Sequence, residues 1–187
     1  MKSKAQTSKA TPRKKANSKS SHETLEDILE DMMKDMYWAE KHLVKALTKM
    51  GKAAYNDELK SSIETHREET ERQIERLEKC FEILGTKAVA KKCEAMQGLI
   101  KEGEEVIGEH SEGHARDAAI IAAAQKVEHY EISAYGTMRT MANVLGKVQC
   151  AELLEESKDE EAETDQKLTE LADKINQLAV EMEEEVA

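Results

Sequence analysis

The sequence predicts an all-α protein, and three observations support this fold class. Of its 187 residues, 36% are charged and only 3% are aromatic, and Pro12 is the single proline. A β-sandwich or barrel requires many strands rich in β-branched and aromatic residues, joined by turns rich in glycine and proline. This chain has too few of those residues. Apolar residues also recur at helical spacing along most of its length.

The apolar runs and the cysteines indicate the cellular compartment in which the protein is expected. The longest strictly apolar run, residues 118–124, has seven residues, whereas a membrane-spanning helix needs roughly 20. We therefore expect no membrane-spanning segment. Cys80, Cys93 and Cys150 are far apart in the sequence and show no CxxC spacing, which favours a reducing cytoplasm.

The charge divides the chain into a basic tail, residues 1–21, and an acidic domain, residues 22–187. The tail carries seven Lys or Arg and no acid, leaving 21 basic and 39 acidic residues in the domain. Because the tail has no large apolar residue after Met1, we expect it to be disordered. It can be a solvated extension, an organelle transit peptide or an arm that binds nucleic acid. The acidic domain would keep such binding weak and sensitive to salt.

The first predicted helix begins at Leu25 and carries an apolar stripe with alternating spacings of four and three residues. Thr24 or Ser21 can cap its start, and Gly51 supplies its end. The stripe is interrupted once, where Glu40 occupies a core position. Its apolar members are Leu25, Leu29, Met32, Met36, Leu43, Leu47 and Met50.

The second predicted helix repeats this pattern. Its stripe ends before Gly85 and turns polar at mid-length, at His66 and Thr70. Its apolar members are Leu59, Ile63, Ile74, Leu77, Phe81 and Leu84. A shorter helical stretch, about residues 91–109, follows and is interpreted as a crossover connection to the third helix.

The third predicted helix begins near Ala115, and the stripe of the fourth runs from Leu154 to Leu178. Each has an apolar stripe that also turns polar at mid-length. The polar residues there are Glu128 and Glu131 in the third helix, and Glu161, Thr164 and Asp165 in the fourth.

These interruptions predict a metal site. Four long helices pack their stripes inward, so the interruptions should meet near the middle of the core. Carboxylates left ionised and unpaired there would each cost several kcal/mol, and two divalent cations would compensate most of the charge. Oxygen-rich sites with an imidazole suit iron, manganese or, less distinctively, zinc. The predicted ligands are Glu40, His66, Glu69, Glu128, Glu131, Glu161 and Asp165.

Each residue also has a simpler interpretation. In so charged a chain, a single glutamate on a stripe is more often a surface-leaning residue, and a single histidine is more often a hydrogen-bonded core residue. Glu69 and Asp165, taken alone, are typical solvated residues. The metal hypothesis depends on four interruptions at matching depth, and on the spacing of His66 and Glu69, which lets both face one point.

Five segments resemble the YciE/YciF family of bacterial stress proteins, within the ferritin-like superfamily. The likeness covers about residues 23–174, and AAQKVEHYEI is its most specific part. The segments are DMYWAEKHLVKAL (35–47), HREETERQIERLE (66–78), KCEAMQGLIKEGEEVI (92–107), DAAIIAAAQKVEHYEISAYGT (117–137) and EEAETDQKLTELA (160–172).

The resemblance implies a ferritin-like four-helix bundle with a helical crossover connection between the second and third helices. It also implies a cytoplasmic homodimer connected with the stress response. By likeness to di-metal carboxylate proteins, Glu40 and Glu128 or Glu131 would bridge or cap the metals. The shells would be completed by His66, Glu69, Glu161 and Asp165.

The chain also departs from the ferritin-like pattern. Di-iron proteins of that superfamily usually place Glu-x-x-His on two helices, whereas this chain has His-x-x-Glu on one helix and a carboxylate pair without histidine on another. A site with fewer imidazoles is harder and more anionic. Manganese is therefore a credible competitor to iron.

Three functional hypotheses follow. The leading one is a site for two metal ions, most favourably iron, that reacts with oxygen or peroxide. The second is a non-catalytic helical scaffold that metal stabilises, and the third is a metal-free bundle whose core carboxylates contact trapped water. The chain contains no GxSxG, P-loop or dinucleotide-binding motif to favour another chemistry.

Overall fold

The structure is a computed structural model that describes residues 23–186. The predicted tail, residues 1–21, and the domain boundary at residue 22 lie outside the described residues. The predicted all-α class is confirmed, because the described part of the chain contains five helices and no strand. None of these helices is both long and apolar enough to cross a membrane.

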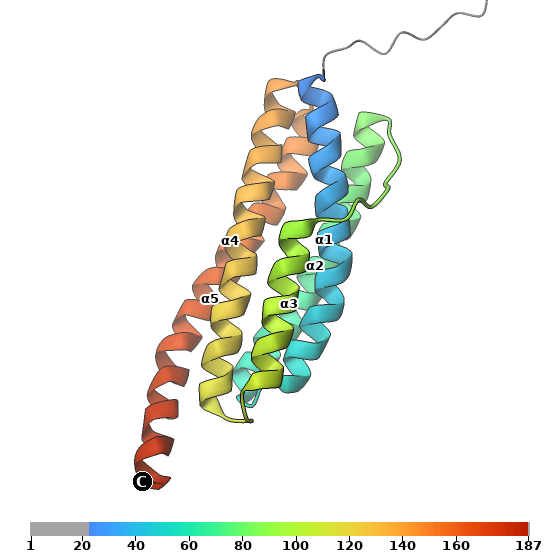
Figure 1. Cartoon of the computed structure of the whole chain (residues 1–187). Helices are drawn as coiled ribbons and strands as arrows, with labels where there is room; N and C mark the ends of the chain where they lie inside the picture. The colour runs from blue at the N-terminus through green and yellow to red at the C-terminus, as the bar shows by residue number, and fades with distance from the viewer. Residues whose placement is uncertain (1–22, 187) are drawn as a thin grey trace, which may run out of the picture.

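Four long helices lie side by side, and a shorter fifth packs against two of them (Figure 1). α1 and α5 run in one direction and α2 and α4 in the other, so the connection from α2 to α4 returns along the length of the molecule. α3 lies in this connection and contacts α1 and α4. The helices are α1 (Leu25–Ala53), α2 (Asp57–Leu84), α3 (Glu94–Glu109), α4 (His114–Val144) and α5 (Val148–Val186).

Local signals set the predicted start of α1 and end of α2. The Thr24 side chain accepts a hydrogen bond from the Asp27 backbone N–H, and the Asp27 carboxylate accepts one from the Thr24 N–H. This capping box satisfies backbone donors that the first helical turn leaves free. Gly85 ends α2 with a φ of 71°, a left-handed conformation that glycine adopts without a steric penalty.

Two predicted boundaries are wrong. Gly51 does not end α1, which continues to Ala53. The chain leaves the helix only where the Asp117 carboxylate, on α4, accepts hydrogen bonds from the backbone N–H groups of the next turn. The second is the start of α3, which begins at Glu94 rather than near residue 91. The Lys91 N–H there donates to a carbonyl of α1 instead of entering a helix.

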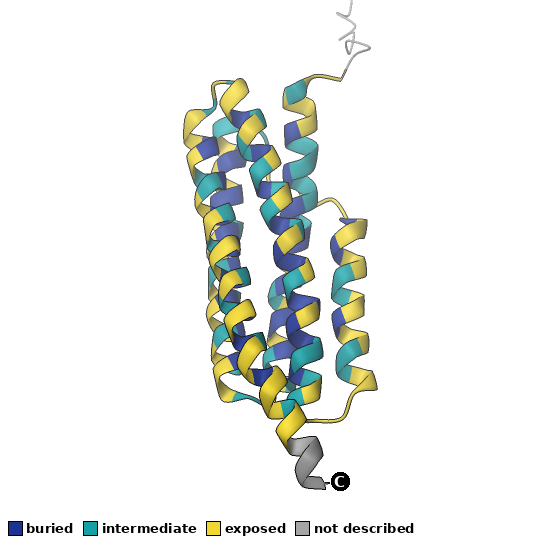
Figure 2. Cartoon of the chain, turned by 90° about the vertical axis from the view of Figure 1, so that its left-hand side faces the viewer, coloured by how far each residue is buried: buried dark blue, intermediate teal, exposed yellow. Residues whose placement is uncertain are grey.

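The core has apolar ends and a polar middle. Buried positions line the inner faces of the long helices (Figure 2). Near the start of α1 these positions include Leu29, Met33, Phe81, Met138 and Leu154. Near the opposite end they include Met50, Leu59, Ile63, Ile120, Leu168 and Ile175. The buried carboxylates and the imidazole lie between these two apolar layers.

Candidate metal centre

The polar middle of the core brings together a cluster of four side chains of the types that commonly bind metals. α2 contributes His66, α4 contributes Glu128 and Glu131, and α5 contributes Glu161. All four are buried, and one ligating atom from each lies within 4.8 Å of the others. The two α4 residues reach the same point because positions three apart share a helix face.

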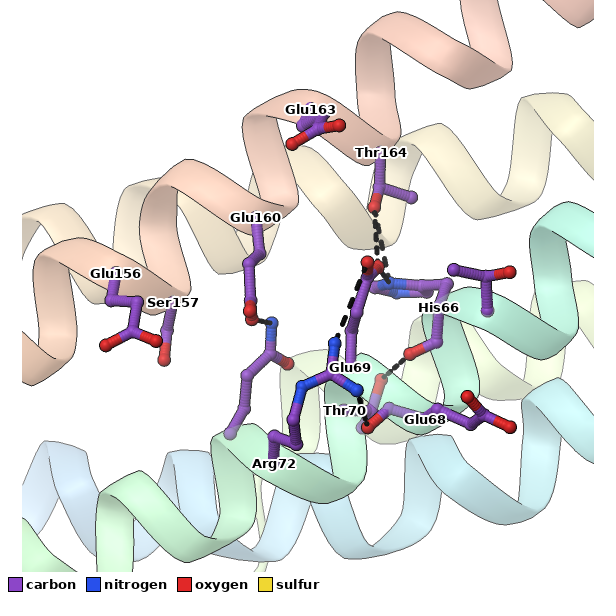
Figure 3. A network of polar contacts seen from close by, with 12 residues as sticks. His66, Glu68, Glu69, Thr70, Arg72, Glu156, Ser157, Glu160, Glu163 and Thr164 are labelled. Carbon is purple, nitrogen blue, oxygen red and sulfur yellow. Dashed lines mark hydrogen bonds and ion pairs between the residues drawn. The ribbon is translucent and has the colours of Figure 1, made fainter.

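The His66 ring divides its contacts between two sides. Its Nε2 atom lies 3.4 Å from Glu128 Oε1 and 3.7 Å from Glu161 Oε2. Its Nδ1 atom lies 3.4 Å from Thr164 Oγ1 and 3.7 Å from Glu69 Oε2. Nε2 therefore faces the cluster, whereas Nδ1 faces Thr164 and Glu69 (Figure 3).

Glu40 brings α1 to the same region. Its side chain is fully buried, and the Tyr135 hydroxyl donates a hydrogen bond to its Oε1 atom. Burial raises the pKa of Glu40 well above its ordinary value, and the neighbouring Glu161 carboxylate raises it further. Glu40 therefore interacts electrostatically with the cluster.

The same physics acts on the α4 carboxyls. Burial is the main cause that raises the pKa values of Glu128 and Glu131. Repulsion comes second, from Glu161 on Glu128 and from Glu40 on Glu131. A low-dielectric interior disfavours several negative charges in one place, and a bound cation would favour them again.

Buried polar atoms without hydrogen-bond partners show whether these residues fit a metal. Six buried atoms of this region have no hydrogen-bond partner among the described residues: Glu40 Oε2, His66 Nε2, Glu128 Oε2, both Glu131 oxygens and Glu161 Oε2. Unmade hydrogen bonds on buried polar atoms are costly, and native proteins make few of them. Carboxylate oxygens with one imidazole nitrogen are a suitable donor set for iron or manganese. The residues therefore fit a metal centre.

The structure brings four of the seven predicted residues within ligating distance of one another: His66, Glu128, Glu131 and Glu161. A fifth, Glu40, is fully buried and interacts electrostatically with Glu161. The other two lie at the edge of the cluster. Glu69 keeps 15% of its side chain exposed and approaches only the Nδ1 side of His66. The neighbouring His66 imidazole lowers the pKa of Glu69.

Asp165 lies on the outer side of α5. Its side chain is 25% exposed, Oδ1 accepts a hydrogen bond from Gln125 at 3.1 Å, and Oδ2 lies 3.3 Å from the exposed His129. Successive helical residues differ by about 100° around the axis. Thr164 takes the inward position, so its neighbour Asp165 turns toward α4.

Sequence reasoning missed several polar residues around the cluster. Tyr135 holds Glu40, and Gln73 donates to Glu161 and, at 3.1 Å, to Glu160. Gln73 is fully buried, whereas Ile74, expected at this point of the stripe, is only partly buried. The spacing His66, Thr70, Gln73, Leu77 would have found it.

A buried arginine extends this network along α2. The Arg76 guanidinium pairs with Glu160 at 2.6 Å and with Glu156 at 2.9 Å, and it donates to Ser157 at 3.2 Å. Figure 3 shows Glu156, Ser157 and Glu160 aligned along α5, leading toward Thr164 and His66. These pairs connect α2 to α5 beside the cluster.

Several known proteins resemble this chain in sequence and in fold. Residues 24–181 match the family described as Domain of unknown function (DUF892). The protein YciF of Escherichia coli (strain K12) is 49% identical over 137 residues, which cover 73% of this chain and 82% of that protein.

Three solved structures resemble the chain. The crystal structure of the E. coli stress protein YciF has a TM-score of 0.81 at 46% identity and covers 83% of this chain and 99% of its own. YcfI of Rhodopseudomonas palustris, titled a candidate structural protein, has a TM-score of 0.77 at 43% identity, with coverage of 79% and 94%. A protein of Xanthomonas campestris shares the fold, with a TM-score of 0.69 at 22% identity and coverage of 86% and 99%.

Proposed function

We propose that this chain, which belongs to the DUF892 family, binds two divalent metal ions in its core, most favourably iron and alternatively manganese. The predicted likeness to the YciE/YciF family is confirmed by the 49% identity to YciF. One observation carries the proposal: six buried carboxylate and imidazole atoms that lack hydrogen-bond partners among the described residues converge on one region.

The contacts suggest a role for each predicted ligand. Glu40, Glu128, Glu131, Glu161 and the Nε2 atom of His66 would hold the ions. Glu69 would accept a hydrogen bond from the His66 Nδ1–H and so orient the ring, as carboxylates commonly do for metal-bound histidines. Asp165 would act from outside, through its charge.

The wider fold belongs to the same proposal. We interpret α1, α2, α4 and α5 as a ferritin-like four-helix bundle and α3 as part of its crossover connection. In that interpretation each long helix supplies at least one side chain to the centre, so the metal ions would link all four. The apolar layers on either side would exclude bulk water from them.

The chain's own residues would prepare the site for redox chemistry. A bound pair of iron ions supplies two electrons to a small oxidant such as oxygen or peroxide. Tyr135 fixes one oxygen of Glu40, and Gln73 fixes one oxygen of Glu161, leaving the other oxygen of each carboxylate free of hydrogen bonds from the described residues. These contacts would hold the carboxylates in place while the charge at the centre changes.

The biological setting is proposed from the relatives. The E. coli relative is titled a stress protein, and we extend a stress-associated role in the cytoplasm to this chain. We also propose that it forms a homodimer. Nucleic acid would bind at most weakly, through the basic tail.

A second candidate function is a non-catalytic scaffold stabilised by metal. The same unpaired atoms favour it, because they require a cation but not a reaction, and the R. palustris relative is titled a candidate structural protein. The third hypothesis, a metal-free bundle, requires water at these atoms instead.

An anaerobic titration with Fe(II) tests the proposal. We expect the metal-free protein to saturate at two iron ions per chain and, after oxygen is admitted, to develop a near-ultraviolet band characteristic of a ferric pair. Glu128→Ala and His66→Ala should lose both, whereas the exposed Glu152→Ala should retain both. Saturation without an oxygen response would support the scaffold, and absence of saturable binding would leave the metal-free bundle.

A further inference from the structure

A pocket of about 280 Å³ lies between α2 and α5, beside the cluster. Its wall includes Thr65 and Glu69 on α2 and Thr164, Lys167, Glu170 and Lys174 on α5. Carboxylate and hydroxyl oxygens, which both helices supply here, can replace the water ligands of a hydrated cation. The pocket therefore has the chemistry of a passage for a small, polar ligand.

The inner wall of this pocket is the outer side of the cluster. Glu69 and Thr164 line the pocket, and both approach the Nδ1 atom of His66, at 3.7 Å and 3.4 Å. The opposite nitrogen of the same ring faces Glu128 and Glu161. Figure 3 shows the Glu69 and Thr164 side chains converging on His66 from the two helices. One imidazole ring thus separates the pocket from the buried carboxylates.

The pocket wall carries two carboxylates, Glu69 and Glu170, and two lysines, each of which pairs with a glutamate outside the wall. Lys167 pairs with Glu163 at 2.9 Å, and Lys174 pairs with Glu58 at 3.2 Å. Neither glutamate belongs to the pocket wall. Lys167 also interacts electrostatically with Glu69 in the wall. Arg72 reaches Glu69 only at 3.9 Å. Counted with these partners, four carboxylates and three basic groups surround the pocket. A small excess of negative charge of this kind favours cations over anions.

Two other pockets offer no comparable route. One, between α1, α3 and α4, lies near Leu43 and Val127, but it has an apolar wall and a volume of only about 10 Å³. The other, of about 410 Å³, lies at the opposite end of the α2–α5 seam, where Gln149 and Glu156 line it. Glu156 there pairs with Arg76 rather than with the cluster.

We propose that divalent metal ions enter the core through the pocket between α2 and α5, and that Glu69 receives each ion before it passes His66. This inference rests on the proposed metal-binding function and adds its route. It gives Glu69 a second task beside orienting the His66 ring. The Glu69 carboxylate and the Thr164 hydroxyl would offer oxygen ligands in place of water, and the buried glutamates would hold the ion beyond them.

The route predicts binding rates that change while the amount bound does not. The probe is Co²⁺, whose visible absorption reports binding, mixed with metal-free full-length protein in a stopped-flow instrument. Thr65→Trp places an indole in the pocket, one helical turn from Glu69. Gln149→Trp is the matched control, because it fills the other pocket on the same seam. Glu69→Gln removes the charge and keeps an acceptor for the His66 Nδ1–H.

We expect Thr65→Trp to slow Co²⁺ binding by about tenfold or more, as an obstructed gate would. Glu69→Gln should slow it by about tenfold at low salt and less at high salt. Thr65→Trp should reach the final stoichiometry of the unmodified protein, and Gln149→Trp should bind at the unmodified rate. Circular dichroism confirms that each variant is folded.

The outcomes separate the route from the function. If the unmodified protein binds Co²⁺ while Thr65→Trp and Glu69→Gln bind it equally fast, the route is overturned and metal binding stands. If Gln149→Trp is slowed as much as Thr65→Trp, the effect is not specific to this pocket and the route is again overturned. If the unmodified protein takes up no Co²⁺, the proposed function and the route both fail.

Discussion

Two kinds of buried carboxylate occur in this molecule. Asp117 and Glu131 lie on the same helix, α4, and both are fully buried. The oxygens of Asp117 accept hydrogen bonds from the Tyr55 and Asn56 backbone N–H groups, at 2.7 and 2.8 Å. Neither oxygen of Glu131 accepts one from any described residue.

This difference shows that burial alone does not identify a functional carboxylate. A buried carboxylate with two hydrogen bonds is a structural element, because folding satisfies it completely. Asp117 holds the turn between α1 and α2 in this way. A buried carboxylate that folding leaves unsatisfied, among others of its kind, needs something that folding does not supply. The Glu131 region is therefore the candidate centre, whereas Asp117 is part of the scaffold that supports it.

Removal of the Asp117 side chain should give a larger loss of stability than substitution of Glu128 or Asp165. Asp117→Ala leaves two backbone donors without their acceptor at a partly buried turn, which we expect to cost about 2 kcal/mol of unfolding free energy. Urea denaturation followed by circular dichroism measures this cost. Because the change does not touch the centre, the cost should be the same with and without bound metal.

The exposed Asp173→Ala on α5 is the control for Asp117→Ala and should change the unfolding free energy little. If Asp117→Ala proved neutral, the Asp117 hydrogen bonds would contribute nothing net to stability. The contrast between a satisfied and an unsatisfied carboxylate would then lose its energetic basis.

The centre should respond to pH in the opposite sense from an ordinary ion-paired carboxylate. The pKa of Glu128 in the folded protein lies well above its ordinary value of 4.5. Below about pH 4.5 both states are protonated. As the pH rises, the unfolded state releases its proton before the folded state does, so the folded state binds more protons and stability falls.

Glu128→Gln removes this dependence, because glutamine has no proton to release. In metal-free protein, the variant should therefore gain about 1 kcal/mol of unfolding free energy relative to the unmodified chain between pH 5 and pH 8. Thermal or urea unfolding of both proteins at the two pH values measures this difference. Saturating metal should reverse the order at pH 8, since the ion favours the ionised carboxylate. A pH-independent difference would contradict the raised pKa of Glu128 in the metal-free protein.

The fold and most of the centre were predictable, because both follow from helical periodicity. Four stripes with polar interruptions at matching depth located Glu40, His66, Glu131 and Glu161 in the core. Capping chemistry at Thr24 is local and was equally readable.

The remaining features depend on how helices pack. Gly51 does not end α1, because the turn is fixed by Asp117 from a helix more than sixty residues away. Tyr135 reaches Glu40 across the core between α4 and α1. The inward choice of Thr164 over Asp165 depends on the rotation of α5 about its axis, which periodicity defines only to within a residue. Contacts of this kind require the assembled structure.

Asp165 provides the smallest expected effect and the finest test of the comparison. Its oxygens face Gln125 and the exposed His129 rather than the cluster. Asp165→Asn keeps the shape of the side chain and an oxygen acceptor, so we expect a change in unfolding free energy below about 0.5 kcal/mol, typical of a partly exposed position. The Fe(II) stoichiometry of Asp165→Asn should match that of the unmodified protein, whereas Glu131→Gln should bind less iron. Loss of an iron equivalent in Asp165→Asn would mean that α5 rotates or that the side chain turns inward when metal binds, and would restore Asp165 to the ligands.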